Sequence, residues 1–207
     1  MEFEKERREV ALFMRRLYSQ KLTTASGGNV SVRAGDRVFI TASQTDKAKL
    51  KAGNVGIITL NGNNLTQELK ISMESKMHLA VYQKRKDILA IVHAHPVFAT
   101  AYAISGKEIK TNLAGEARAL LGVPALTQYA LMGTRKLAGM VASASLTSNV
   151  ILLENHGVIT LGSTLFQAYE RMEVLEATAK LTFITSVLGD AKQLTQKELK
   201  AVDELFE

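Results

Sequence analysis

The sequence predicts an α/β fold in which a central sheet is covered by helices on its faces. Short apolar runs of strand length lie in the middle of the chain, at 88–92 and 150–157. Segments with apolar residues at helical spacing lie before, between and after these runs, and the longest spans 165–188. The chain has only two prolines, no low-complexity linker and no repeat, so one domain over residues 1–207 is expected.

The elements can be placed in order along the chain. Residues 4–20 have the pattern of an amphipathic helix, and a turn rich in Ser, Gly and Asn follows them. Ser72 is expected to cap a helix that ends near residue 84. The dipeptide at 155–156 places a turn near the centre of a strand pair. Further strands are expected at 30–33, 37–41, 57–60, 88–95, 150–157 and 158–161, and further helices at 97–104, 111–122, 132–144 and 165–188.

Composition excludes several classes of protein. A hydrophobic content of 46% with 22% charged residues is typical of a globular protein and argues against disorder. The absence of cysteine excludes disulfides, iron–sulfur clusters and thiolate zinc sites, and it agrees with a reducing cytoplasm. The charged N-terminus lacks the apolar core of a signal peptide, and no apolar stretch reaches membrane-spanning length. A cytoplasmic protein without a membrane partner is therefore expected.

The net charge of +6 favours anionic ligands. The basic residues are nevertheless scattered along the chain, and no basic stripe is interleaved with aromatic residues. We therefore expect a small anionic ligand and no nucleic-acid partner.

Histidines at the end of a buried strand are the most informative residues. The chain has four histidines, and His93 and His95 follow an apolar run and precede Pro96, which ends the strand. Residues two apart in a strand point to the same face, so these two imidazoles share one side. His156 lies in another strand-like run. Three imidazoles without cysteine form the ligand set of a catalytic zinc site, so a metal enzyme is the leading hypothesis.

Histidines in such a pattern are not specific to one class of protein. A single histidine beside an apolar stretch is more often a core or surface residue than a ligand. His-x-His pairs also occur in cupin barrels, amidohydrolase barrels and three-histidine carbonic anhydrases. A cupin needs a glutamate where this chain has VFAT at 97–100, amidohydrolase barrels need more histidines, and those carbonic anhydrases are nearly all β. These three classes therefore fit the sequence poorly.

Glu74 is the candidate acid/base. It falls in the first turn of the expected helix, where the helix dipole favours a carboxylate even without a catalytic role. Beside a metal, such a carboxylate could move a proton at a carbon next to a polarised carbonyl. His78 lies four residues later on the same helix face, where packing explains it better than support of the metal site.

Three polar segments are candidates for phosphate binding. The turn at 26–29 (SGGN) offers backbone N–H groups that side chains do not obstruct. The turn at 41–44 (TASQ) adds a hydroxyl and an amide, and Ser72 adds a donor at a helix start. Such residues also form ordinary turns, so their weight comes from occurring together with the histidines.

These pieces, in this order, resemble the class II aldolase/adducin family, and in particular its sugar-phosphate aldolases of the fuculose-1-phosphate aldolase type. The resemblance extends over nearly the whole chain. The matching segments are 26–31 (SGGNVS), 41–43 (TAS), 72–74 (SME), 78–82 (HLAVY), 92–96 (VHAHP), 154–158 (ENHGV) and 168–176 (AYERMEVLE).

The resemblance implies a three-layer α/β/α fold around a mostly antiparallel sheet, commonly assembled as a homotetramer with sites at subunit boundaries. It also implies a zinc cofactor held by His93, His95 and His156, and a catalytic acid/base at Glu74. The phosphate pocket would be lined by Gly28, Asn29, Ser43 and Ser72 and shaped by Ser26 and Gly27.

The implied activity is that of a zinc-dependent aldolase, although another divalent metal could serve. It would reversibly cleave a ketose 1-phosphate, such as fuculose 1-phosphate, to dihydroxyacetone phosphate and an aldehyde through a metal-stabilised enediolate. The chain departs from the family pattern at Ala42 and Gln44, which stand for Pro and Gly, and at Met73, which replaces a small polar residue. The segment 112–116 lacks the tyrosine that the best-known aldolase supplies across a subunit boundary, so the aldehyde-side proton donor is unassigned.

Related activities stay open within the family. A pentulose-phosphate 4-epimerase uses the same metal and bond cleavage but tends to carry aspartate in place of Glu74. A methylthioribulose-1-phosphate dehydratase keeps the glutamate but usually has serine in place of Pro96. An adducin-like assembly module is the non-enzymatic alternative, and such modules generally lack the metal histidines. These features favour the aldolase without identifying its aldehyde.

Overall fold

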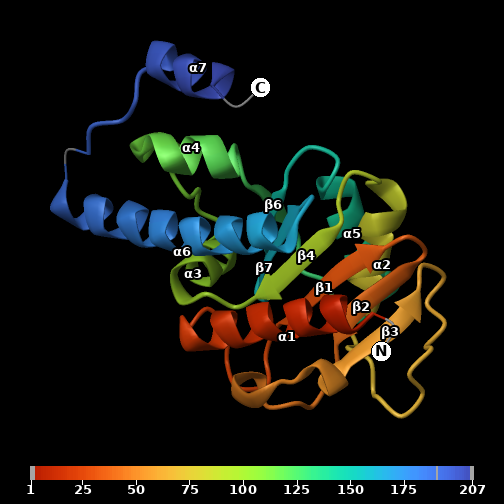
Figure 1. Cartoon of the computed structure of the whole chain (residues 1–207). Coiled ribbons are helices and arrows are strands. Elements are labelled where there is room, and N and C mark those ends of the chain that lie inside the picture. The colour runs from red at the N-terminus through yellow and green to blue at the C-terminus, as the bar shows by residue number, and fades with distance from the viewer. Residues whose placement is uncertain (1–2, 190, 206–207) are drawn as a thin grey trace.

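The computed structural model describes residues 3–189 and 191–205. It has a central sheet with helices on both faces (Figure 1). The ends of the range 1–207, expected to form one domain, lie outside the described residues. Residues 1 and 2 also belong to the N-terminal segment that we expect not to be a signal peptide, and they too lie outside the described residues.

Seven strands, most of them short, make up the sheet: β1 (Asn29–Ala34), β2 (Arg37–Thr41), β3 (Val55–Thr59), β4 (Ala90–Ala94), β5 (Ala125–Thr127), β6 (Val150–Leu153) and β7 (Gly157–Gly162). In space they follow the order β3-β2-β1-β4-β7-β6-β5. Among the strand pairs that the described residues form, only β5–β6 is parallel. The mostly antiparallel sheet expected from the family resemblance is therefore confirmed.

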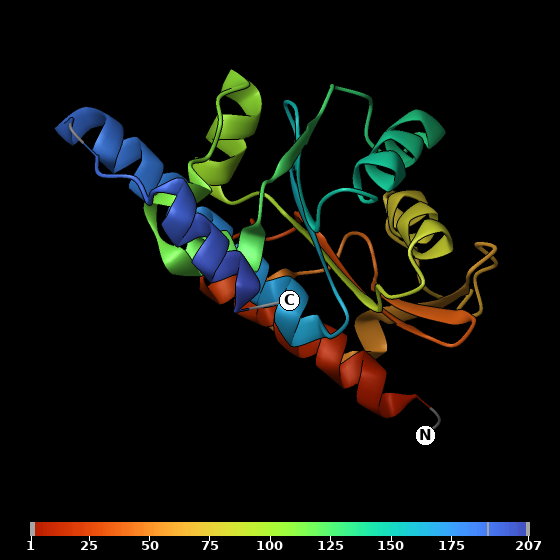
Figure 2. The same ribbon diagram turned by 90° about the horizontal axis from the view of Figure 1, so that it is seen from above.

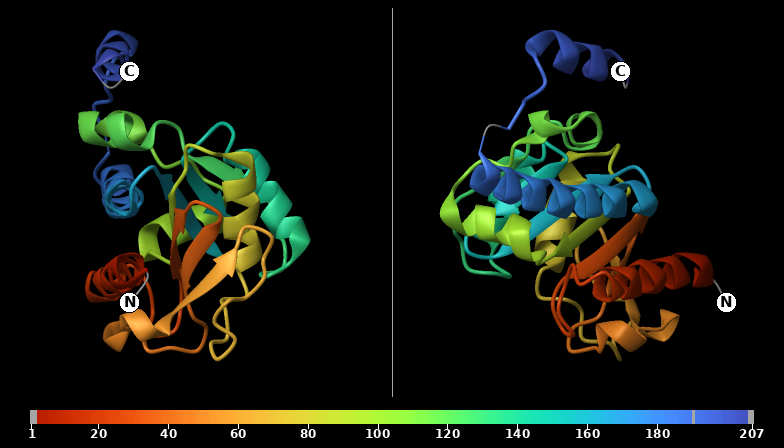
Figure 3. Two further views of the ribbon diagram at one scale, coloured as in Figure 1. Left: turned by 45° about the vertical axis from the view of Figure 1, so that its right-hand side comes forward. Right: turned by 90° about the vertical axis from the view of Figure 1, so that its left-hand side faces the viewer.

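Seven α-helices surround the sheet in the described part of the chain: α1 (Glu4–Ser19), α2 (Ser75–Lys84), α3 (Val97–Ser105), α4 (Gly115–Leu121), α5 (Arg135–Ala144), α6 (Leu165–Leu188) and α7 (Gln196–Glu204). Helices α1, α3 and α6 lie on one face, and α2 and α5 lie on the other (Figures 2 and 3). The expected three-layer α/β/α arrangement is confirmed. None of the described helices is both long and apolar enough to cross a bilayer.

Strand β4 shows how the sheet separates two apolar cores. Successive side chains of a strand point to opposite faces. Ile91 accordingly packs in the core beneath α2 and α5, and Val92 packs in the core beneath α1 and α6. Both side chains are fully buried. Helix α6 packs across β4 and β7 through the apolar stripe from which the helix was predicted. This packing holds the strand ends that lie next to the histidines in place.

The start of α2 differs from the expectation. Ser72 does not cap the helix, because its Oγ accepts a hydrogen bond of 3.3 Å from the backbone N–H of Glu74. Glu74 itself occupies the N-cap position, one residue before the helix rather than in its first turn, and its side chain makes no capping bond. Its carboxylate is therefore not held by the helix end.

One strand and one α-helix were not predicted from the sequence, and one predicted helix corresponds to two separate elements. Strand β5 has three residues, which is too short for a recognisable alternation. Helix α7 begins with a capping box between Thr195 and Glu198, a signal that was available in the sequence. The helix expected at 111–122 is divided into a short 3-10 turn, Thr111–Leu113, and α4, because the backbone of Ala114 between them is extended.

Candidate active site

Three histidines meet at the end of β4. His93 lies in β4, His95 directly follows it, and His156 lies in the turn between β6 and β7. The antiparallel register of β4 and β7 sets Ala94 opposite Val158 and so brings that turn beside the end of β4. One ring nitrogen of each histidine lies within 4.8 Å of the others. The sequence placed the first two histidines together, and the strand pairing adds the third.

The backbone orients the ring of His93. Its Nδ1 lies 2.8 Å from the carbonyl oxygen of Val158, which can only accept, so Nδ1 carries the proton. Its other ring nitrogen, Nε2, faces His95, whose Nε2 is 3.2 Å away. A backbone carbonyl that fixes the tautomer in this way is typical of metal-binding histidines.

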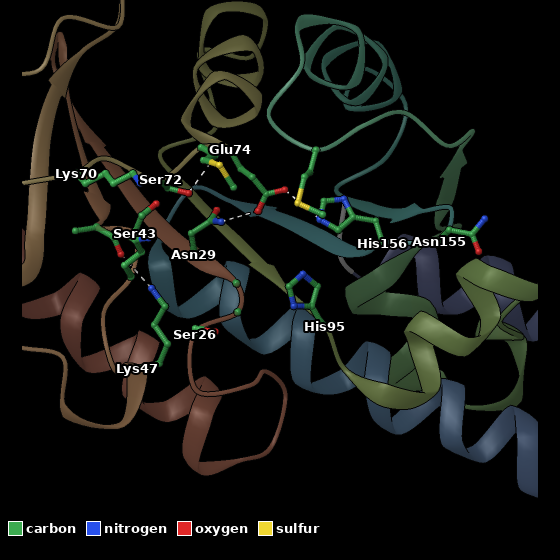
Figure 4. A pocket seen from close by; sticks show the side chains of 16 residues that line it. Ser26, Asn29, Ser43, Lys47, Lys70, Ser72, Glu74, His95, Asn155 and His156 are labelled. Carbon is green, nitrogen blue, oxygen red and sulfur yellow. Dashed lines mark hydrogen bonds and ion pairs between the residues drawn. The ribbon is translucent and has the colours of Figure 1, made fainter.

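The carboxylate of Glu74 lies against two of these rings. Oε2 is 3.1 Å from Nε2 of His93 and accepts a hydrogen bond of 2.9 Å from Nδ2 of Asn29. Oε1 is 3.1 Å from Nε2 of His156, but their geometry is not that of a hydrogen bond, and this oxygen has no hydrogen-bond partner among the described residues. Figure 4 shows Glu74 between Asn29 and His156.

This donor set fits a divalent metal ion. Burial alone would raise the pKa of Glu74, but His93 and His156 hold it well below its usual range, so the carboxylate is ionised. Burial, together with any charge on His93, lowers the pKa of His95 to about 3 and keeps that ring neutral, the form that binds metals. A buried carboxylate beside converging imidazole nitrogens needs a cation, and three imidazoles are the ligands that zinc favours.

Two glycines make room for His95. A Cβ atom on Gly157 would lie 2.5 Å from Cδ2 of His95, and one on Gly27 would lie 2.9 Å from its Nδ1. Real side chains do not approach so closely, so glycine at both positions is required by the ring. The glycine after His156 and the glycine-rich turn therefore serve the histidine cluster directly.

His78 stays apart from this cluster. Its ring is fully buried, and Nδ1 lies 2.7 Å from the hydroxyl of Ser31, which also contacts the hydroxyl of Tyr82 at 2.7 Å. The packing role expected for this histidine agrees with that position, and it is not among the converging ligands.

A cavity of about 500 Å³ opens from the cluster and gathers the expected phosphate residues. Glu74, His95 and His156 line one end, whereas His93 is fully buried behind them. All four residues proposed for phosphate binding line the same cavity, as do the two residues expected to shape it: Gly28, Asn29, Ser43, Ser72, Ser26 and Gly27.

The two polar turns have backbone conformations suited to an anion. Gly28 has a φ of +68°, and a Cβ there would lie 2.7 Å from the carbonyl oxygen of His93. Gln44 has a φ of 58°, a left-handed conformation that costs a side-chain-bearing residue roughly 1–2 kcal/mol. This is the position where the family usually has glycine. No hydrogen bond in the described part of the chain uses the backbone N–H of either residue.

Several residues that line the cavity were not predicted from the sequence. Asn155, Met132 and Lys70 line it, and Figure 4 shows Lys70 near Ser43. Lys47 is more unusual, because its side chain is only 2% exposed. Its burial depends on contacts between distant segments, so no local pattern indicated it.

Comparisons with known proteins agree with the fold. The family model of the class II aldolase and adducin N-terminal domain matches residues 8–183. An L-fuculose phosphate aldolase of Methanocaldococcus jannaschii is 38% identical over 170 residues, which cover 82% of this chain and 91% of that protein. A 5-deoxy-D-ribulose 1-phosphate aldolase of Bacillus thuringiensis is 32% identical over 209 residues, covering 100% of this chain and 98% of that protein.

A third relative is named for a different reaction. A 3-oxo-tetronate 4-phosphate decarboxylase of Haemophilus influenzae is 32% identical and covers 91% of both chains. Among solved structures, an L-fuculose 1-phosphate aldolase superposes with a TM-score of 0.90 at 30% identity, covering 98% of this chain and 96% of that one.

Proposed function

The chain belongs to the class II aldolase and adducin family, and on that premise we propose that it is a zinc-dependent aldolase of ketose 1-phosphates. The family and its named aldolase relatives make the chain an enzyme, a lyase. The proposed reaction reversibly cleaves a ketose 1-phosphate of the fuculose 1-phosphate kind to dihydroxyacetone phosphate and an aldehyde. The observation that carries this proposal is a single cavity that is lined by Glu74, His95 and His156 together with residues of both polar turns.

We propose His93, His95 and His156 as the metal ligands. Their ring nitrogens converge, and the Nδ1 proton of His93 is committed to Val158. When bound, zinc supplies positive charge that polarises the ketose carbonyl and stabilises the enediolate left by bond cleavage. Another divalent metal with the same preference for imidazole could replace it.

Glu74 is the proposed acid/base. In the cleavage direction Glu74, after taking up a proton from water, gives it to the carbon from which the aldehyde has departed, and the electron pair of the broken C–C bond forms the new C–H bond. In the condensation direction it removes that proton. The amide of Asn29 holds Oε2 of Glu74 at 2.9 Å and so keeps the carboxylate directed at the cavity.

The two remaining roles concern the ends of the substrate. We propose that Gly28, Asn29, Ser43 and Ser72 bind the phosphate. At the other end, the hydroxyl that becomes the aldehyde oxygen must release its proton, and residues 112–116 contain no tyrosine that could take it. Every copy of the chain shares this absence, so we propose that a different residue of a neighbouring copy in a homotetramer supplies this group.

A cleavage screen tests the proposal. Zinc-loaded protein is offered a panel of ketose 1-phosphates, and released dihydroxyacetone phosphate is measured with a coupled dehydrogenase. We expect release from fuculose 1-phosphate or a close analogue, and none above background from the His95→Ala variant. The panel includes a 3-oxo-tetronate 4-phosphate because one relative is named for its decarboxylation. Carbon dioxide from that compound, with no dihydroxyacetone phosphate from any ketose, would overturn the aldolase in favour of a decarboxylase.

A further inference from the structure

Lys47 is a buried lysine that forms no ion pair with the acidic residues that the structure describes. Its side chain is 2% exposed, and Nζ donates hydrogen bonds of 3.2 Å to the carbonyl oxygen of Ala42 and to Oγ1 of Thr45. An ammonium group has three protons to donate. No carboxylate within 3–189 or 191–205 forms an ion pair with it. Burial of an unpaired charge is unfavourable unless a ligand supplies the opposite charge.

The surroundings hold this lysine at the phosphate end of the cavity. Its backbone N–H donates a hydrogen bond of 2.9 Å to Ala25, which ties it to the glycine-rich turn. It begins a 3-10 turn, Lys47–Lys49, whose start is capped when Asp46 Oδ1 accepts a hydrogen bond of 3.0 Å from the N–H of Ala48. Figure 4 shows Lys47 with Ser26 and Ser43, on the side of the cavity away from His156.

We propose that Lys47 is the cation that binds the substrate's phosphate, and this inference rests on the proposed function of the cavity. The hydroxyls and backbone N–H groups of the polar turns are neutral donors that fix the position of an anion. A phosphate monoester carries a charge of about −1.5 to −2 at neutral pH and gains more from a charged donor than from neutral ones. Lys47 supplies that charge from a site that water barely reaches.

The charged neighbours of Lys47 are few. Lys70 lines the same cavity but is exposed, and Asp46 is exposed and engaged by Ala48. From α1, Arg15 contacts the carbonyl oxygen of Leu50 rather than the cavity. Burial lowers the pKa of Lys47 to about 8. The ammonium form therefore dominates below pH 8 and is lost above it, so anion binding should weaken as the pH rises through 8.

Sulfate is the probe for the first test, because it stays a dianion at every pH used. Metal-loaded wild-type protein is titrated with sulfate by calorimetry at pH 7 and pH 9. We expect the affinity to fall about tenfold, since about one tenth of a group with a pKa of 8 stays protonated at pH 9. The Lys47→Met variant should bind at least about tenfold more weakly at pH 7, with no further fall at pH 9.

Lys49→Met is the matched control. It removes the same charge from the same 3-10 turn, but Lys49 is exposed and does not line the cavity. We expect it to bind sulfate as the wild type does. Wild-type affinity in Lys47→Met at pH 7 would overturn the proposal, and so would an equal loss in both variants.

A second variant guards against misfolding. Lys47→Gln keeps amide protons for Ala42 and Thr45 but removes the charge, so it should melt like the wild type while losing sulfate affinity. Inorganic phosphate is then titrated at pH 7 to show the same order of affinities. Sulfate binding tests the role of Lys47 even if no ketose is cleaved. A failure of this inference can therefore be told apart from a failure of the proposed function. An active aldolase whose Lys47→Gln form binds sulfate normally would disprove this inference alone.

Discussion

The side-chain amide of Asn29 donates a hydrogen bond of 2.9 Å to Oε2 of Glu74. Asn29 also pairs with His93 across strands β1 and β4, and it ends the glycine-rich turn. One residue therefore connects the proposed phosphate pocket, the acid/base and a proposed metal ligand. Because these contacts join three separate segments, the site is held as one unit rather than as independent loops.

Glu74→Gln should separate binding from proton transfer. The amide keeps the shape of the side chain but is not a usable base, so zinc content and sulfate affinity should stay near wild type. Proton exchange at dihydroxyacetone phosphate, followed by NMR in heavy water, should slow by about 10²-fold or more. Glu68→Gln, at an exposed position that does not line the cavity, is the control. Undiminished exchange in Glu74→Gln would mean that another residue is the base.

The histidine cluster should determine the metal content. Purified wild-type protein should contain close to one zinc ion per chain, measured by mass spectrometry after dialysis. His95→Ala should lose it, because only two of the three converging imidazoles remain. His78→Gln is a matched control, since His78 is the histidine outside the cluster. The fold of His95→Ala should survive, and equal zinc in all three proteins would refute the site.

Gly157→Ala should weaken metal binding by steric displacement. The added Cβ would lie 2.5 Å from the ring of His95 and 2.7 Å from the carbonyl oxygen of Ala94. The ring must move, so zinc affinity should fall by about 10-fold or more, on the order of effects seen for residues that orient ligands. Gly139→Ala is the contrasting change, because nothing lies within 4 Å of its Cβ and helix α5 should gain about 0.5–1 kcal/mol. Competition with a zinc chelator measures both affinities.

The sequence predicted the parts of the site that depend on local pattern. An apolar run ended by Pro96 placed His93 and His95 on one strand end, and structure and sequence agree there. The helix over 165–188 was predicted with its observed bounds because its long apolar stripe is unambiguous.

The parts that were missed depend on contacts between distant segments. Glu74 lies before α2 because Ser72 forms a turn with it, and its carboxylate is engaged by Asn29 rather than by the helix end. The burial of Lys47 depends on a hydrogen bond to Ala25 and on the packing of α1 over its 3-10 turn. Neither property follows from residue spacing, because both arise only when the chain has folded.

His78 should make the metal-free protein less stable in acid. Burial lowers the pKa of His78 to about 3, against an ordinary value of 6.5. Below pH 6.5 the unfolded chain therefore binds a proton at His78 that the folded protein does not bind. The contribution of this group to the free energy of unfolding is fully present above pH 6.5 and declines as the pH falls toward 3. Between pH 7 and pH 5 this group should cost about 2 kcal/mol of unfolding free energy. In urea titrations, the unfolding free energy of His78→Gln should fall between pH 7 and pH 5 by about 2 kcal/mol less than that of the wild type. Equal falls in the two proteins would contradict this role of His78.

Assembly of the protein should depend on the last turns of α6. Exposed apolar side chains gather there at helical spacing, and they are Leu181, Phe183, Ile184, Val187 and Leu188. Val187 is 72% exposed, which is unfavourable for an apolar patch unless a partner covers it. A second copy of the chain is the expected partner, because the resemblance to the family implies sites at subunit boundaries.

Light scattering during size-exclusion chromatography should show a homotetramer for wild type and smaller species for Val187→Glu. Leu65→Glu introduces the same charge at an exposed apolar residue outside α6 and should leave the assembly intact. Specific activity should fall when dilution or Val187→Glu separates the subunits, because a site shared between copies is then incomplete. A wild-type monomer with full activity at the assay concentration would rule out the shared site, and the aldehyde-side group would then have to come from the same chain.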